Sequence, residues 1–476
     1  MEHTKLYHVV AQFNKYEQNR CRKFVQSPYF NRSEALEVLF EEISRHINGE
    51  KKASVEKEAL WKKAHPGKEY DDVRFRKYVS DLLKLVESYL AQEQYESQQL
   101  HQTNQLLSGL GDRKFDQLVS GALRKAGRLT ETAPHKSAAY FYQQYAFENN
   151  KYRLLYQDRH GSERTNITDI SSCLDYFYMA EKIRIKCAAL SRQYDEGDHK
   201  YELLFIDDII QHVAQNEPHY EDIPPVIIYY YIYKSMSEVD QPDHYFRLRT
   251  LLDRHGLQFR REEAFWLYTF AINYCVRRIN QGKSEFLREY FMLYQDLLKK
   301  ELIIIDGELA IGHFRNVVTV GLRLGEIKWT ESFILKHKQY LPEIHRENAV
   351  TFNLAQLYFY QKEYDKVIET LQFVEYNDLS YNLRSKTFLL MTYYEQDEIE
   401  PLYSLMDSFR AYLGRHQNIP PRRKKMYQDL IRSTKKLSRI IPGDKVAIEK
   451  FKKELEGMKS MASYQWVQEK IAELEV

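Results

Sequence analysis

NLAQLYFYQKEYDKVIETLQFV, residues 353–374, is the stretch that decides the fold. Its apolar residues recur at the three- and four-residue spacing of two short helices, with Leu354 and Tyr358 in the first and Val367 and Leu371 in the second. Two further copies repeat this pattern, one at Val317, Val318, Gly321, Ile327, Thr330 and Ile334, the other at Leu389, Leu390, Tyr393, Ile399, Leu402 and Met406.

The copies recur at a nearly constant distance along the chain. Val317, Leu354 and Leu389 occupy equivalent positions and are 37 and 35 residues apart. A period of this length is typical of stacked helical hairpins. Because each hairpin has an apolar face that it cannot bury alone, we expect an all-α fold in which antiparallel helix pairs stack into a right-handed α-solenoid with a long binding surface.

Four helical parts are expected along the chain. They are an N-terminal head (1–97), divergent helical hairpins (98–310), the repeats (311–443) and a C-terminal capping helix pair (444–476). In the last part, the predicted helices 444–456 and 460–474 carry apolar residues that can cover the final repeat, namely Met458, Met461, Trp466, Val467, Ile471 and Leu474.

Some local patterns within these parts need separate interpretation. The segment 226–233 is rich in β-prone residues, but Pro224 and Pro225 favour the first turn of a helix, so we expect a buried helix. Glycines in the segments 109–112 and 127–135 indicate breaks between helices.

Composition agrees with a helical, intracellular protein. The chain has 476 residues, only 17 Gly and 12 Pro, 29% charged residues and a formal net charge of +2. No apolar run approaches the length of about 18 residues needed to cross a membrane, and the N-terminus lacks the apolar core of a secretion signal. The four cysteines show no disulfide or CxxC spacing. These features predict a cytoplasmic location and no membrane association.

The three copies resemble tetratricopeptide repeats. The pattern of Leu354, Ala355, Tyr358, Tyr364 and Leu371 is similar to that family, and Gly325-Glu326 matches its turn in the first copy. Val367 and Leu402 depart from it, because the family prefers alanine there. The resemblance covers about a fifth of the chain and implies a helical scaffold that binds proteins or peptides.

A second resemblance extends over more of the chain. It is carried by the segments Phe24-Val25-Gln26-Ser27-Pro28-Tyr29-Phe30-Asn31, Tyr78-Val79-Ser80-Asp81-Leu82-Leu83, Phe314-Arg315-Asn316 with Trp329, and Trp466-Val467-Gln468-Glu469-Lys470-Ile471. These are similar to a family of large helical bacterial proteins of unassigned function. This resemblance implies a shared architecture and no activity.

The sequence contains no local signature of catalysis. Gly282-Lys283-Ser284 ends like a phosphate-binding loop, but Arg277 stands where that loop needs a glycine. The 16 histidines form no HExxH motif, and no Gly-x-Ser-x-Gly elbow is present. We therefore expect no enzyme, and no catalytic, cofactor or metal site.

A solenoid of this kind predicts a non-enzymatic interaction scaffold. A peptide or protein partner is expected on the concave face, which the first helix of each repeat lines. The candidate contact residues on these helices are Asn316, Arg323, Asn353, Gln356 and Tyr360.

A basic segment offers a further contact surface. Between Arg415 and Arg439 nine residues are basic and one, Asp429, is acidic. The segment is amphipathic, so it is either the solvated face of a packed helix or a patch for an acidic partner or nucleic-acid phosphates. The residues expected to form that patch are Arg422, Arg423, Lys424 and Lys425.

The head permits an alternative function. Leu60-Trp61 and the segment 76–80 resemble the winged-helix domain of bacterial regulators, which would make the chain a DNA-binding transcriptional regulator. The residues that would face DNA are Arg74, Arg76, Lys77 and Lys84. No glycine-rich wing follows Leu90, so a helical cap on the solenoid is the competing interpretation of the head.

Overall fold

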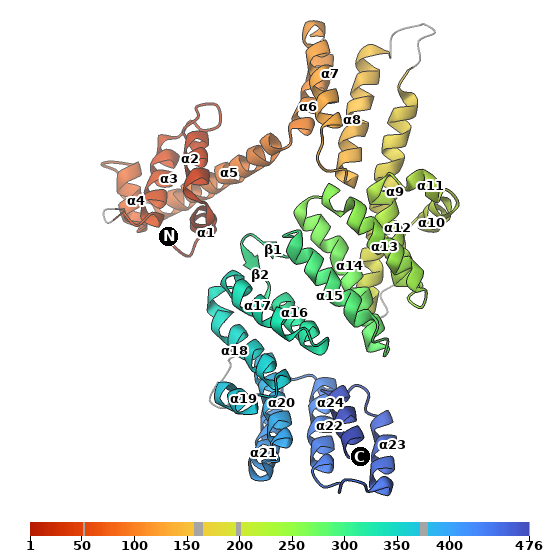
Figure 1. Ribbon diagram of the computed structural model, residues 1–476. Coiled ribbons are helices and arrows are strands. Elements are labelled where there is room, and N and C mark those ends of the chain that lie inside the picture. Colours follow the sequence, from red (N-terminus) through yellow and green to blue (C-terminus); the bar gives the residue numbers. More distant parts are fainter. Residues whose placement is uncertain (51–52, 114, 157–164, 197–200, 372–378, 476) are drawn as a thin grey trace. The chain divides into compact units, whose positions relative to one another are not determined.

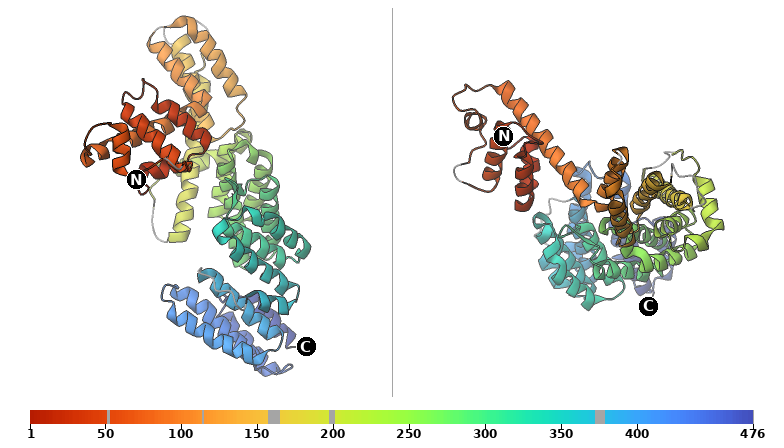
Figure 2. Two further views of the ribbon diagram at one scale, coloured as in Figure 1. Left: turned by 90° about the vertical axis from the view of Figure 1, so that its left-hand side faces the viewer. Right: turned by 90° about the horizontal axis from the view of Figure 1, so that it is seen from above.

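The computed structural model describes residues 1–50, 53–113, 115–156, 165–196, 201–371 and 379–475 (Figure 1). In these residues the chain is all-α, as expected (Figure 2), with helices α1 to α24 and one two-stranded β hairpin, labelled β1 and β2 in Figure 1. It divides into two compact units, Met1–Lys182 and Ile183–Val476. No helix in the described part of the chain has both the length and the apolar character needed to span a lipid bilayer.

The N-terminal unit begins with five helices: α1 (Lys5–Gln12), α2 (Lys15–Val25), α3 (Glu34–Ile47), α4 (Lys57–Ala64) and α5 (Asp72–Ser97). Polar caps fix where some of them start. At α2, the Asn14 side chain accepts hydrogen bonds from the Tyr16 and Glu17 amides, and the Glu17 carboxylate accepts one from the Asn14 amide. Leu39 and Phe40 of α3 lie in the apolar core of these helices.

The unit continues with α6 (Gln99–Asp112), α7 (Asp116–Glu131), α8 (Ala138–Leu155) and the start of α9 (Ile167–Glu196). Helix breaks are confirmed close to the two expected segments, since α6 ends at Asp112 and α7 ends at Glu131, but Gly109 and Gly127 themselves lie inside these helices. Gly111, near the end of α6, permits close packing against α8. A Cβ on Gly111 would lie 2.8 Å from a methyl carbon of Leu154 in α8.

The C-terminal unit contains the remaining elements. They are α10 (Ile206–Gln215), α11 (Glu217–Tyr220), α12 (Pro224–Ser237), α13 (Pro242–His255), the 3-10 helix η1 (Gly256–Gln258), α14 (Arg261–Asn280), α15 (Phe286–Lys299), β1 (Ile304–Ile305), β2 (Glu308–Leu309), α16 (Ile311–Arg323), α17 (Ile327–His337), the 3-10 helix η2 (Lys338–Tyr340), α18 (Glu343–Tyr360), α19 (Tyr364–Leu371), α20 (Leu379–Glu395), α21 (Ile399–Arg415), α22 (Pro421–Leu437), α23 (Lys445–Glu456) and α24 (Tyr464–Glu473). The expected buried helix at 226–233 is confirmed as α12.

Consecutive helices of this unit pair as hairpins. Helix α14 packs on α15, α16 on α17, α18 on α19, and α20 on α21. Among the first helices of these hairpins, α16 contacts α18, α18 contacts α20, and α20 contacts α22. The three sequence copies therefore correspond to three hairpins, α16–α17, α18–α19 and α20–α21.

The three hairpins turn with the same backbone geometry. Gly325, Lys362 and Asp397 all have positive φ, at 74°, 62° and 59°. In the first copy the Gly325 amide donates to the Leu322 carbonyl (3.0 Å) and the Glu326 amide to the Gly321 carbonyl (2.9 Å). This is the Schellman motif, which ends a helix on a left-handed residue. The same two bonds recur at the other two turns, so the period extends to the turns themselves.

A fourth turn of this kind lies between α14 and α15. Gly282 has φ of 86°, its amide donates to the Ile279 carbonyl (3.0 Å), and the Lys283 amide donates to the Arg278 carbonyl (3.0 Å). The Gly-Lys-Ser sequence is therefore part of a hairpin turn. The β1–β2 hairpin, inserted between α15 and α16, pairs Ile304 with Leu309 and lengthens the spacing to the next copy.

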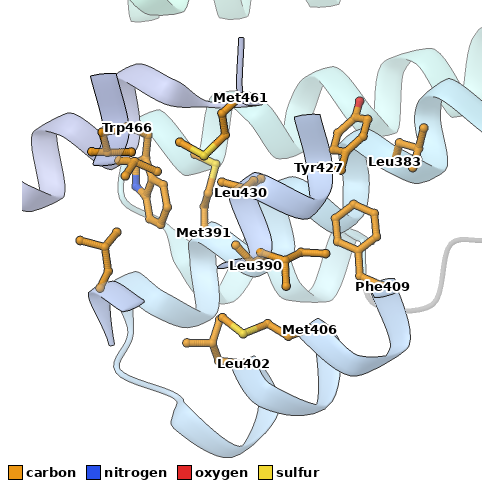
Figure 3. Packing of buried hydrophobic residues seen from close by; sticks show 14 of the residues in the cluster. Leu383, Leu390, Met391, Leu402, Met406, Phe409, Tyr427, Leu430, Met461 and Trp466 are labelled. Atoms are coloured by element: carbon orange, nitrogen blue, oxygen red, sulfur yellow. The ribbon is translucent and has the colours of Figure 1, made fainter. Parts of the chain in front are cut away.

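Helices α22 to α24 complete a shared core with α20 and α21 (Figure 3). The expected capping residues Met461, Trp466, Val467 and Ile471 are buried in it, while Met458 and Leu474 pack at its edge. The two expected helices 444–456 and 460–474 are present as α23 and α24, and they share this core with α20 and α21.

Candidate binding face

The predicted contact residues lie on two neighbouring first helices. Asn316 and Arg323 belong to α16, and Gln356 and Tyr360 to α18. The Thr319 hydroxyl donates to the Gln356 side-chain oxygen at 3.5 Å, which joins the two helices. We call the surface formed by Asn316, Thr319, Arg323, Gln356 and Tyr360 the first-helix face.

The fifth predicted contact residue, Asn353, is not on that surface. Its side chain is completely buried, and its Nδ2 atom donates to the Ala349 carbonyl at 2.7 Å. Gln356 is also almost fully buried, with 2% of its surface exposed. Both amides therefore help to pack α18, whereas Arg323 and Tyr360 expose their side chains to solvent. The sequence period alone could not separate these two roles, because all four residues belong to first helices.

A cavity of about 170 Å³ adjoins the first-helix face between α14, α15 and α16. Its apolar lining comes from Val276, Ile279, Leu287, Tyr290 and Val320, and its polar lining from Asn280, Asn316, Thr319 and Arg323. Two predicted contact residues, Asn316 and Arg323, therefore border one cavity. The part contributed by α14 and α15 was not predicted, because these helices belong to none of the three sequence copies.

The floor of the cavity is fixed by aromatic contacts. Tyr290 and Tyr294 meet edge to face with their ring centroids 5.1 Å apart. The Tyr294 hydroxyl also accepts a hydrogen bond from the Asn316 amide (3.3 Å) and lies 3.1 Å from the His313 Nδ1 atom. Burial lowers the pKa of His313, so its ring is neutral near pH 7. A preformed cavity of this kind can receive one large apolar side chain without reorganisation.

The C-terminal helix α24 lies beside the first-helix face. The Arg323 guanidinium donates to the Gln465 side-chain oxygen at 3.0 Å. At α20, the Trp466 indole donates to the Glu395 carboxylate (2.7 Å), and the Lys470 ammonium donates to the same carboxylate (2.8 Å). Glu395 therefore anchors α24 through both of its oxygens, a role that no sequence pattern indicated.

The basic segment is confirmed as helical, since residues 421–437 form α22. Arg422 and Lys425 are exposed, and Arg423 and Lys424 are half-buried. No acidic side chain among the described residues forms an ion pair with Arg422, Lys424 or Lys425. Further along α22, Lys436 bonds to Glu454 of α23 (2.6 Å). The start of the helix therefore carries positive charge that nearby described acids do not neutralise, which is what a docking patch requires.

The predicted DNA-facing residues lie on α5, where most of them pair with acids of the same helix or its cap. Arg74 lies 3.4 Å from Asp71, Lys84 lies 3.4 Å from Asp81, and Arg76 binds Asp72. These pairs reduce the positive field that phosphate contacts need. Helix α5 runs without a break from Asp72 to Ser97, and no strand occurs in the described residues of the head.

The described side chains offer little for catalysis. Burial raises the pKa values of the Cys21, Cys173 and Cys275 thiols to about 12, so these groups remain protonated and unreactive. Cys187 is also a buried free thiol whose pKa burial raises. Within the described ranges, no group of three or more His, Cys, Asp or Glu side chains is placed to hold a metal ion.

Comparison with known proteins adds no relative. No protein-family model matches the sequence, no curated protein is significantly similar to it, and no solved structure shows a significant match.

Proposed function

We propose that the chain is a non-enzymatic scaffold of the tetratricopeptide-repeat type, which binds an extended peptide segment of a partner protein along the first-helix face. The observation that carries this proposal is the cavity of about 170 Å³ that Asn316 and Arg323 border. Its apolar walls suit a large apolar side chain, and the exposed Arg323 guanidinium at its edge suits a carboxylate or carbonyl oxygen of the same peptide.

The repeated turns support the scaffold interpretation. Hairpins that share one turn geometry add binding surface in equal steps, which favours an extended ligand over a compact one. The four cysteines are buried thiols with no disulfide, which is consistent with our proposal that the scaffold works in the reducing cytoplasm.

The test uses the full chain as bait for a random dodecapeptide display library. Enriched peptides are measured by fluorescence anisotropy against the wild type and against Ile279→Trp, which places an indole in the cavity. We expect at least tenfold weaker binding by this variant and by Arg323→Ala. Leu335→Trp, which alters a half-exposed residue of α17 away from the cavity, is the matched control and should bind normally. Enriched peptides that bind Ile279→Trp as tightly as the wild type would refute the proposed site.

A further inference from the structure

Helices α16, α20 and α22 each carry an arginine near their N-terminal ends. Arg315 lies in the second turn of α16, Arg384 in the second turn of α20, and Arg423 in the first turn of α22. The amides that begin a helix add partial positive charge to that of such side chains. The three residues therefore place positive charge near the N-terminal ends of α16, α20 and α22.

Packing brings Arg315 and Arg384 together. The hydrogen bond between Thr319 of α16 and Gln356 of α18 joins two residues that are 37 positions apart in the sequence. Arg315 and Phe352 are also 37 positions apart, so they lie beside each other one helical turn further along the same two helices. The Phe352 ring in turn lies 5.4 Å, centroid to centroid, from the ring of Tyr381 in α20. Tyr381 precedes Arg384 by three residues, so both project from the same side of α20.

Packing also brings Arg423 close to Arg384. Leu383 of α20 and Tyr427 of α22 lie close together in one core cluster (Figure 3). Arg384 follows Leu383 directly, and Arg423 precedes Tyr427 by one helical turn. Arg384 and Arg423 are therefore close enough for their charges to interact between α20 and α22.

The charges of Arg315 and Arg384 are not compensated by the described residues. The Arg384 Nε atom is buried and has no hydrogen-bond partner among them. Residues 372–378 lie outside the described part of the chain. Within the described part, no acidic side chain forms an ion pair with Arg315 or Arg384. Burial lowers the pKa of Arg384, and the charges of Arg315 and Arg423 lower it further. A guanidinium nevertheless stays charged at neutral pH, so the cluster remains cationic.

We propose that Arg315, Arg384 and Arg423 form a binding site for a phosphoryl group. A phosphate monoester carries close to two negative charges at pH 7 and three acceptor oxygens, enough to bond to several guanidinium groups at once. A single carboxylate supplies one charge and two oxygens, which would leave the cluster undercompensated. This site goes beyond the peptide-binding function proposed above, and it shares no residue with the cavity.

Thermal unfolding of the full chain tests the site, with inorganic phosphate as the probe and sodium chloride of equal ionic strength as the reference. If phosphate binds with a dissociation constant of about 1 mM, a concentration of 10 mM increases the folded-to-unfolded ratio roughly tenfold. The midpoint should then rise by about 2 °C.

Arg384→Met gives the decisive comparison. Without phosphate this variant should melt above the wild type, because it replaces a buried, repelled charge by an apolar chain of similar length. It should also lose the increment that phosphate gives to the wild type. Arg432→Gln removes an exposed charge of α22 outside the cluster and should keep the full increment. An unchanged increment in Arg384→Met, or a wild-type shift no larger than that caused by sodium chloride, overturns the proposal.

Two further probes identify the source of the phosphoryl group. Binding of N-acetyl-O-phosphoserine amide that is tighter than binding of inorganic phosphate supports a phosphorylated side chain of a protein. Equal or weaker binding supports the site with a free phosphate as its ligand. N-acetylglutamate amide is the carboxylate control, and its binding as tightly as phosphate would overturn the phosphoryl assignment.

Discussion

Loss of the Glu395 carboxylate should release α24 from the rest of the C-terminal unit. Glu395 accepts hydrogen bonds from the Trp466 indole and the Lys470 ammonium, and the side chains of Glu395 and Lys470 are only 13% and 11% exposed. Burial alone would lower the pKa of Lys470, but its hydrogen bonds to Glu395 and Glu473 and the charges of both acids raise it. The ammonium is therefore charged and depends on these acids.

The loss of stability depends on which hydrogen-bonding groups each substitution leaves without a partner. Removing one partner of a buried ion pair costs about 3 to 5 kcal/mol. In Glu395→Ala the Lys470 ammonium still bonds to the exposed Glu473 carboxylate at 2.8 Å, so we expect about 2 to 3 kcal/mol. Glu395→Gln keeps an acceptor for the Trp466 indole and should cost less, about 1 to 2 kcal/mol.

Amide hydrogen exchange of a peptic fragment covering α24 measures this loss locally. A decrease of 2 to 3 kcal/mol in the free energy of opening speeds exchange roughly 30- to 160-fold. Fragments from α2 and α3 of the N-terminal unit serve as internal controls and should exchange at wild-type rates. In the double variant Glu395→Gln/Lys470→Met the acceleration should be smaller than the product of the single effects, because each single change leaves a partner unpaired. Wild-type exchange of α24 in Glu395→Ala would refute this account of how the helix is held.

Three further outcomes are expected. Gly321→Ala should lower the free energy of unfolding by about 1 to 3 kcal/mol in urea titration, because its Cβ would lie 2.3 Å from the Thr330 hydroxyl oxygen of α17. Burial lowers the pKa of His313, so its contribution to stability is complete above the ordinary pKa of about 6.5 and is lost progressively as pH falls from that value through the lower pKa of the folded state. The drop in melting temperature from pH 7.5 to 5.5 should therefore be smaller in His313→Gln. Neutralising Arg422, Lys424 and Lys425 to Gln should change stability by less than about 1 kcal/mol while weakening the binding of acidic display peptides, most strongly at low salt; equal binding at every salt concentration would eliminate the patch.

The sequence was sufficient to predict most helices in the last third of the chain. Apolar residues at helical spacing place α16 to α21, and the predicted capping helices 444–456 and 460–474 correspond closely to α23 and α24. These predictions depend on local patterns, which a helix displays in full along its own length. The exact ends of α6 and α7, a few residues after Gly109 and Gly127, were not predictable in this way. A glycine that ends a helix and one that admits a neighbouring helix look alike until the neighbour is known.

The residues of the candidate site were only partly predictable, because the exposure of a side chain depends on tertiary packing. The period identified first helices, but which of their side chains face solvent depends on the helices packed against them. Asn353 of α18 is completely buried. Arg323 of the neighbouring helix α16 is exposed and donates a hydrogen bond to Gln465. The partners Glu395 and Lys470 are 75 residues apart, a separation at which no sequence spacing carries information.

The turns show where the repeat could have been followed further. A Schellman motif needs a residue that tolerates positive φ, and three different residue types, at Gly325, Lys362 and Asp397, fill that position here. A search for glycine alone therefore finds only one of these three turns. Gly282 lies 43 residues before Gly325 and outside the period of the other copies, because the β1–β2 hairpin is inserted between them. An insertion shifts the register of a repeat without changing the geometry of its turns. The backbone bonds at Arg278 and Ile279 thus identify α14–α15 as a fourth hairpin of the same kind, and it is this hairpin that supplies most of the apolar wall of the cavity.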